Sequence, residues 1–119
     1  MQAVNILVVD DNLTIAELLA EVIADLGHTV CAIEATELGA VTAAAQHRPD
    51  LMIVDVRLGH GSGVVAVDTI IRSRPVPHIF VSGDIAQVLA LRPNAVTLQK
   101  PYSEAALITA MERALATAD

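Results

Sequence analysis

Short apolar runs alternate with amphipathic segments along the whole chain. Three runs, 6–9, 51–54 and 79–81, are continuous in apolar residues, and polar residues follow each of them. Such runs are typical of strands that are buried on both faces of a sheet. Two further segments, 29–33 and 95–99, are flanked or interrupted by polar residues. We expect these two segments to be strands at the edges of the same sheet.

Helical spacing and capping residues predict a helix after each strand. In the first interval, apolar residues recur every three or four positions between Ile15 and Leu26, and Gly27 is a suitable C-terminal stop. The expected helices share a capping residue at the start and a helix breaker or the chain end at the finish. They begin after Asp11 or Asn12, after Thr36, near Gly63, after a capping box of Asp84 with Gln87, and after Ser103.

This alternation predicts an α/β fold in which a strand–helix unit occurs five times. Buried strands belong in the middle of a sheet and half-exposed strands at its edges. The pattern therefore favours a doubly wound, five-stranded parallel sheet in the order 2-1-3-4-5. The length of 119 residues suits one domain, and no linker or repeat interrupts it. We expect a single domain over 1–119 with no output domain.

Composition excludes several classes of function. The formal net charge is −7 and the 7 basic residues are scattered, which argues against direct DNA or RNA binding. No apolar run approaches the roughly 18 residues of a membrane span, and no secretory signal is evident. The single cysteine, Cys31, is expected to be a buried thiol in a reducing compartment. The sequence therefore predicts a cytoplasmic protein without membrane insertion.

Polar residues stand at the ends of four predicted strands. They are Asp10 with Asp11, then Asp55, Ser82 and Lys100. Because the carboxyl ends of parallel strands meet at one edge of a sheet, we expect these side chains to converge where ligands bind in such folds. A lone aspartate at a strand end would more simply cap its own loop, but that explanation fits poorly for residues at four matching ends.

The chemistry of this set points to a divalent cation and a phosphoryl group. Neighbouring carboxylates repel each other by about 4 kcal/mol at 4 Å and an effective dielectric constant of 20, so they need a cation. Oxygen ligands suit Mg²⁺ or Mn²⁺ rather than zinc. Asp55 could then act as a nucleophile toward phosphorus, with Lys100 and Ser82 around the phosphoryl oxygens.

These residues and their spacing resemble the receiver domain of two-component response regulators over the whole chain. The matching motifs are Val8-Val9-Asp10-Asp11-Asn12, Val54-Asp55 with Gly63, Val81-Ser82-Gly83 and Lys100-Pro101-Tyr102. The resemblance implies a flavodoxin-like receiver fold and a domain that is not a separate enzyme. It implies that Asp55 accepts a phosphoryl group from a sensor histidine kinase or a histidine phosphotransfer protein, and that the signal passes to a downstream effector protein.

The resemblance also assigns individual roles. Asp10, Asp11, Asp55 and the backbone carbonyl of Arg57 would hold Mg²⁺. Ser82 would be the hydroxyl that moves onto the phosphoryl group, and Lys100 would be its charge partner.

Three positions depart from the usual receiver pattern. Thr97 stands where most receivers have an aromatic switch residue, Gly59 replaces a proline after the phosphoacceptor, and the segment 83–99 is shorter than usual. The fourth helix is therefore expected to be short. A short fourth helix together with the missing aromatic resembles a subset of stand-alone receivers in general stress and phosphorelay networks.

Two alternatives and one finer hypothesis accompany this interpretation. A receiver-like adaptor could work by protein binding without phosphorylation. Such an adaptor would not need the Asp, Ser and Lys set, so the presence of the complete set argues against this alternative. A phosphatase that forms an aspartyl phosphate would need a second Asp at the position of Arg57. We also hypothesise an Arg57–Asp84 ion pair that covers the site, against the simpler case of two solvated side chains.

Overall fold

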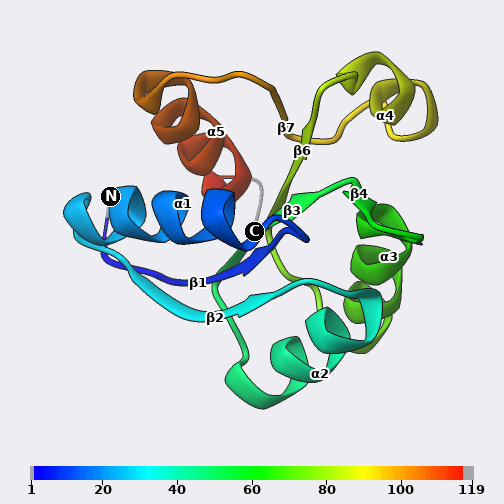
Figure 1. Cartoon of the computed structure of the whole chain (residues 1–119), viewed down its shortest axis with the longest axis horizontal. Helices are drawn as coiled ribbons and strands as arrows, with labels where there is room; N and C mark the ends of the chain where they lie inside the picture. The colour runs from blue at the N-terminus through cyan, green and yellow to red at the C-terminus, as the bar shows by residue number, and fades with distance from the viewer. Residues whose placement is uncertain (1, 117–119) are drawn as a thin grey trace.

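The computed structural model describes residues 2–116, which form one parallel sheet covered by helices on both faces (Figure 1). The sheet contains five strands in the order β2-β1-β3-β6-β7. Their bounds are β1 Asn5–Val9, β2 Thr29–Glu34, β3 Leu51–Asp55, β6 His78–Ser82 and β7 Thr97–Gln99. Counted among these five strands alone, the order is the predicted 2-1-3-4-5, and the α/β receiver-type fold is confirmed.

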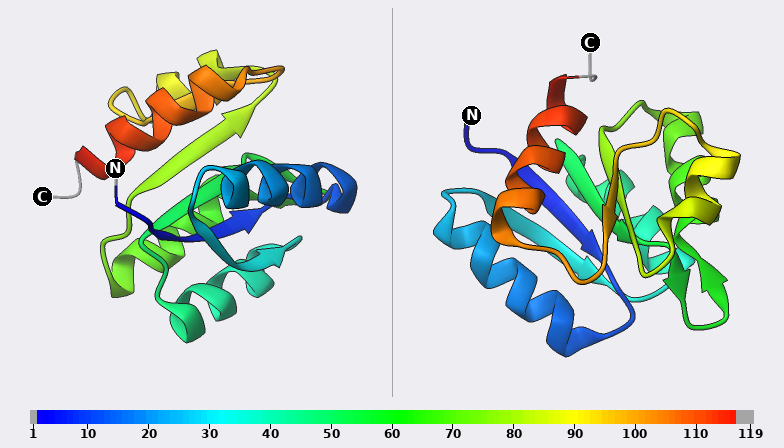
Figure 2. Two further views of the ribbon diagram at one scale, coloured as in Figure 1. Left: turned by 90° about the vertical axis from the view of Figure 1, so that its left-hand side faces the viewer. Right: turned by 90° about the horizontal axis from the view of Figure 1, so that it is seen from above.

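Successive residues of the central strands face opposite layers of the core. In β1, Ile6 and Val8 pack toward one face while Leu7 and Val9 pack toward the other. The first face is covered by α1 (Leu13–Asp25) and α5 (Glu104–Ala116), and the second by α2 (Glu37–His47), α3 (Gly63–Ser73) and α4 (Ile85–Leu91). Figure 2 shows these two helical layers from two further directions. All residues of β3 are buried, whereas those of β2 are not, as predicted for a central and an edge strand.

Side-chain caps begin most of the helices where the sequence predicted them. The side chains of Asn12, Thr36 and Ser103 accept hydrogen bonds from backbone N–H groups in the first turns of α1, α2 and α5. Gly27 has a positive φ of 93° just beyond α1, a conformation that suits glycine. Helix α4 is short, as expected from the shortened segment.

The expected start of α3 is confirmed, and the expected cap of α4 is wrong. Helix α3 begins at Gly63, and the Ser62 side chain caps it by accepting a hydrogen bond from the N–H of Val65. The predicted capping box of Asp84 is absent, because the Asp84 side chain makes no capping hydrogen bond to α4. The first N–H of α4 binds a residue of β7 instead.

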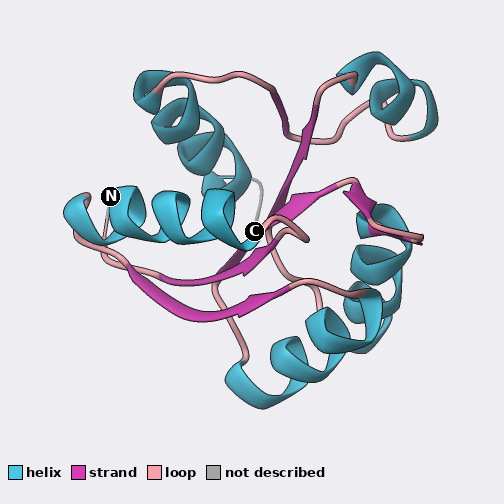
Figure 3. Ribbon diagram, in the orientation of Figure 1, coloured by secondary structure: helices cyan, strands magenta, loops and turns pink. Residues whose placement is uncertain are grey.

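A small antiparallel hairpin follows β3 and was not predicted. It pairs β4 (Arg57–Leu58) with β5 (Gly61–Ser62) through a turn in which Gly59 has a φ of 58° (Figure 3). The carboxylate of Glu37 in α2 accepts a hydrogen bond of 2.6 Å from the Ser62 N–H. A contact between residues so far apart in the chain leaves no local pattern, which is why the sequence did not predict the hairpin.

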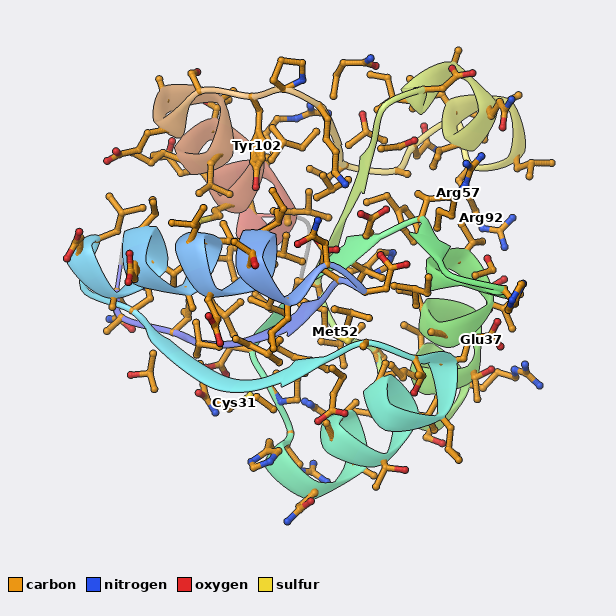
Figure 4. The ribbon with its side chains drawn as sticks, in the orientation of Figure 1. Cys31, Glu37, Met52, Arg57, Arg92 and Tyr102 are labelled. Carbon is orange, nitrogen blue, oxygen red and sulfur yellow. The ribbon has the colours of Figure 1, made fainter. Side chains whose placement is uncertain are left out.

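None of the helices in residues 2–116 has the length and apolar character that crossing a membrane requires. Cys31 lies on β2 below the sheet in the view of Figure 4, and its thiol is half-buried rather than fully buried. The thiol contacts the carbonyl oxygen of Ile6 at 3.4 Å, and burial raises the pKa of Cys31. It is therefore a packing residue with low thiolate content.

Candidate functional site

The strand ends bring the predicted site residues to one hollow in the surface. Its volume is about 590 Å³. All six residues that the sequence singled out for the site line this hollow: Asp10, Asp11, Asp55, Arg57, Ser82 and Lys100. The doubly wound topology explains this convergence, because β1, β3, β6 and β7 are neighbours and run in parallel.

Three carboxylates form the floor of the hollow. Asp10, Asp11 and Asp55 each offer an oxygen within 4.8 Å of the others. Asp10 and Asp55 are only 7% and 8% exposed, and they are the charged or polar residues that the core encloses within the described chain. Oxygen ligands that are negatively charged and partly open to water fit Mg²⁺ or Mn²⁺. The donor set therefore suits the predicted metal.

A backbone N–H orients each of the three carboxylates. Asp10 accepts from the N–H of Asn12 at 2.9 Å, and Asp55 accepts from the N–H of Arg57 at 3.1 Å. Asp11 accepts from the N–H of Gly59 at 2.7 Å, across 48 positions of sequence. A proline at position 59 would have no N–H to donate. The departure from the usual receiver pattern at Gly59 thus adds an anchor for Asp11.

The charges in the hollow are unbalanced without a cation. Burial is the largest cause that raises the pKa of Asp10, and the negative charges of Asp55 and Asp11 raise it further against the hydrogen bond from Asn12. Burial alone lowers the pKa of Lys100, but the hydrogen bond and charge of Asp55, helped by Asp10, outweigh it and leave that pKa raised. Lys100 is consequently charged at neutral pH and compensates only part of the negative charge.

Replacing Asp10 by asparagine is expected to stabilise the metal-free protein by about 1 kcal/mol, a figure that allows for solvent screening of the repulsion. The amide oxygen of asparagine can still accept the hydrogen bond from the Asn12 N–H. Thermal melting without Mg²⁺ measures this change in stability, and melting with Mg²⁺ measures how much the metal stabilises each protein. Mg²⁺ should raise the melting temperature of the wild type and raise that of Asp10→Asn much less.

The matched control for this prediction is Asp25→Asn, which removes an exposed carboxylate at the end of α1. It should leave both the metal-free stability and the Mg²⁺ response unchanged. If Asp10→Asn destabilised the metal-free protein, repulsion among the carboxylates would not be the dominant effect.

Lys100 and Ser82 reach the hollow from neighbouring strands. Lys100, the only lysine in the sequence, forms an ion pair with the second oxygen of Asp55. The N–H of Lys100 donates to the carbonyl of Ser82 at 2.8 Å, which joins the two strand ends. The Ser82 hydroxyl accepts a hydrogen bond of 2.9 Å from the Asp84 N–H.

The hypothesised ion pair between Arg57 and Asp84 is not formed. Both residues line the hollow, but the ion pairs among the described residues join Lys100 to Asp55 and Arg92 to Asp68. Arg57 belongs to the β4–β5 hairpin and its side chain is exposed, so hydration competes effectively with a surface pair. Arg57 and Arg92 both lie on the α3–α4 side of the molecule (Figure 4). Arg57 contributes its backbone N–H to Asp55, and its carbonyl as a metal ligand stays a prediction.

Tyr102 lines a second, mainly apolar cavity of about 470 Å³ next to the carboxylates. Apolar residues of β1, β3, β6 and α1 line this cavity together with Asp10, Asp55 and Lys100. Tyr102 is half-buried and packs against the α1–α5 side of the core, and burial is the main cause that raises its pKa. Figure 4 shows Tyr102 beside α5, just before that helix begins.

Gly63 has a structural role that the sequence did not reveal. The sequence analysis named it only as part of a motif with Asp55. A Cβ atom at this position would overlap the backbone carbonyl oxygen of Asp55 and press on the side chain of Val54. The N–H of Gly63 donates to the carbonyl of Val56 at 2.8 Å. Helix α3 therefore begins directly against the end of β3, and only glycine permits that approach.

Comparison with known proteins gives a consistent result over nearly the whole chain. The family model of the response regulator receiver domain matches residues 6–112. The solution NMR structure of the receiver domain of PhyR from Erythrobacter litoralis has a TM-score of 0.87 and 29% sequence identity, covering 98% of this chain and 93% of that one.

Two curated relatives extend this comparison. The phyllosphere-induced regulator PhyR of Methylorubrum extorquens is 32% identical over 117 residues, which are 95% of this chain and 44% of the regulator. A protein-glutamate methylesterase/protein-glutamine glutaminase of Nitrosospira multiformis is 33% identical over 116 residues, 86% of this chain and 33% of that protein. The chain spans less than half the length of each relative.

Proposed function

The chain belongs to the response regulator receiver family of two-component signalling, and we propose that it carries its signal as a phosphoryl group on Asp55. The donor is a phosphohistidine on a sensor histidine kinase or a histidine phosphotransfer protein. The phosphorylated chain then binds a separate effector protein or passes the phosphoryl group on. We place this activity in the cytoplasm and do not regard the chain as a separate enzyme.

One observation carries this proposal. Asp55 lies between two kinds of charge: one of its oxygens pairs with Lys100, and the carboxylates of Asp10 and Asp11 provide ligand atoms within 4.8 Å. A carboxylate with a fixed cation on one side and a metal-binding pair on the other is poised for phosphoryl transfer. Positioning and neutralisation of charge account for most of the catalysis of such transfers.

The chemical step in this proposal is an in-line displacement. A carboxylate oxygen of Asp55 attacks phosphorus, a P–O bond forms, the P–N bond to the donor histidine breaks, and the histidine nitrogen keeps the electron pair. Lys100 already contacts Asp55 and follows the charge onto the phosphoryl oxygens. The Ser82 hydroxyl is the further donor for those oxygens.

The proposed Mg²⁺ ligands are Asp10, Asp11, Asp55 and the backbone carbonyl of Arg57. When bound, Mg²⁺ or Mn²⁺ would neutralise charge on the carboxylates and on the phosphoryl oxygens. Two of the three carboxylates are anchored by N–H groups from the segment that follows Asp55, namely those of Arg57 and Gly59. That segment therefore helps to keep the ligands in place.

An exposed apolar stripe on α1 borders the hollow and supports a protein as the phosphoryl donor. Ile15 and Leu18, which lie three positions apart and so share a face of the helix, are both exposed, and Ile15 also lines the hollow itself. Together with α5, this part of α1 borders a shallow groove of about 220 Å³. Exposed apolar patches of this kind mark protein contacts, so we propose that the donor docks here.

Incubation with Mg²⁺ and acetyl phosphate, followed by intact-mass measurement, tests the proposed function. The wild type should gain the mass of one phosphoryl group, and chelation of Mg²⁺ or the change Asp55→Asn should abolish the gain. The matched control is Asp50→Asn, which removes an exposed carboxylate at the opposite end of the same strand. A wild type that gains no phosphoryl group, even from a cognate kinase, would instead indicate an adaptor that works by binding alone.

A further inference from the structure

The side-chain amide of Gln99 bridges the end of β7 and the start of α4. Its nitrogen donates to the carbonyl oxygen of Gly83 at 2.6 Å, and its oxygen accepts from the N–H of Ile85 at 3.3 Å. The first N–H groups of a helix have no partner within the helix. Since the Asp84 side chain does not cap α4, Gln99 satisfies one of these groups from outside.

The two hydrogen bonds of Gln99 go to the residues before and after Asp84, and Asp84 binds the Ser82 side chain. Gly83 and Ile85 lie on either side of Asp84, whose N–H donates to the Ser82 hydroxyl at 2.9 Å. Gln99 is also the partner of Ser82 in the register between β6 and β7. Gln99 thus fixes the loop from Ser82 to Ile85 to β7, next to the residue that carries the proposed switch hydroxyl.

Few other contacts fix the position of α4. The helix has seven residues, of which only Val88 is buried, and Leu91 is 71% exposed. At its far end, Arg92 forms an ion pair with Asp68 of α3. Figure 1 shows α4 at a corner of the molecule, beyond the end of β6. The Gln99 bridge therefore holds the start of α4, and the exposed Arg92 pair adds a weaker contact at its other end.

We propose that Gln99 is the positioning residue that couples Ser82 to α4, in a domain where Thr97 leaves no aromatic side chain for that purpose. Thr97 and Gln99 are two positions apart on β7, so they point to the same face of the sheet. This inference rests on the proposed function of Asp55. The Asp84 N–H binds the Ser82 hydroxyl, so moving that hydroxyl onto a phosphoryl group requires either that this hydrogen bond breaks or that the loop follows the hydroxyl. The Gln99 bridge opposes movement of the loop.

Replacing Gln99 by leucine is expected to make the phosphorylated arrangement easier to reach. Beryllofluoride, a stable substitute for the phosphoryl group, should bind the Mg²⁺-loaded variant about fivefold more tightly, the size expected when two solvent-exposed hydrogen bonds no longer favour the unliganded loop. Without beryllofluoride, amide hydrogen exchange at Ile85 should be several-fold faster than in the wild type. Gln46→Leu, the same change on the exposed side of α2, is the matched control.

Mg²⁺ affinity separates coupling from general damage to the fold. It depends on the carboxylates, so it should stay within about twofold of the wild-type value in Gln99→Leu. Gln99→Glu retains the acceptor for Ile85 but not the donor for Gly83, and it should give an intermediate exchange rate.

The outcomes distinguish this inference from the proposed function. If the wild type binds beryllofluoride and Gln99→Leu binds it equally or more weakly, the coupling role of Gln99 is overturned and the proposed function stands. Wild-type exchange at Ile85 in Gln99→Leu would also overturn it, because the bridge would then not hold α4. If the wild type binds no beryllofluoride with Mg²⁺ present, the proposed function fails and the coupling fails with it.

Discussion

Replacing Lys100 with methionine is expected to slow phosphoryl transfer to Asp55 by about a hundredfold, the usual effect of removing one group that stabilises developing negative charge. Lys100 is the only side-chain cation paired with Asp55 among the described residues. Without Lys100, the metal would be the only positive charge to neutralise three carboxylates and the incoming phosphoryl group. The rate of mass gain with acetyl phosphate and saturating Mg²⁺ measures the effect.

The control variant for this prediction is Lys100→Arg, which keeps the positive charge but changes its shape. It should retain much more activity than Lys100→Met, while melting curves establish that both variants are folded. A transfer rate for Lys100→Met within about threefold of the wild type would contradict the assigned role, because that difference is under 1 kcal/mol of transition-state stabilisation.

Replacing Gly63 with alanine is expected to lower the free energy of unfolding by about 2–3 kcal/mol, as overpacking in a close-packed interior does. The added methyl group would overlap the carbonyl oxygen of Asp55, so either β3 or the start of α3 must shift. Because Asp55 itself is displaced, Mg²⁺ affinity should fall together with stability. Urea unfolding followed by circular dichroism gives the first quantity, and a Mg²⁺ titration gives the second.

Gly83→Ala is the matched control for the glycine prediction. A Cβ at Gly83 meets no atom within 4 Å, and its backbone does not require a positive φ. This variant should stay within about 0.5 kcal/mol of the wild type, as surface substitutions usually do. Equal stabilities for the two alanine variants would show that the approach of α3 to β3 is not tight.

The layout of the fold could be predicted because it depends on local patterns. The continuous apolar run 51–54 marked a central strand, and the interrupted segments 29–33 and 95–99 marked the edges. The β4–β5 hairpin could not be predicted in the same way. It depends on the hydrogen bond from Ser62 to Glu37 and on a positive φ at Gly59, and neither leaves a periodic signal.

The composition of the site was predictable and its internal contacts were not. Parallel strands bring their carboxyl ends together, so Asp10, Asp55 and Lys100 had to meet. The Gly59 N–H binds the Asp11 carboxylate, and the Gln99 side chain binds the carbonyl of Gly83 just before α4. Neither a glycine nor a glutamine at these positions suggests such a contact from sequence alone. The hypothesised pair of Arg57 with Asp84 was wrong because proximity to one hollow does not fix exposed side chains.

Mapping the modified residue shows whether Asp55 carries the phosphoryl group. After reaction with acetyl phosphate and Mg²⁺, borohydride reduction converts an aspartyl phosphate to homoserine, which peptide mass spectrometry can locate. We expect homoserine at position 55 in the wild type and at no position when Mg²⁺ is chelated. Homoserine at Asp10 or Asp11, or a stable phosphate on Ser82 with Asp55 unmodified, would contradict this expectation.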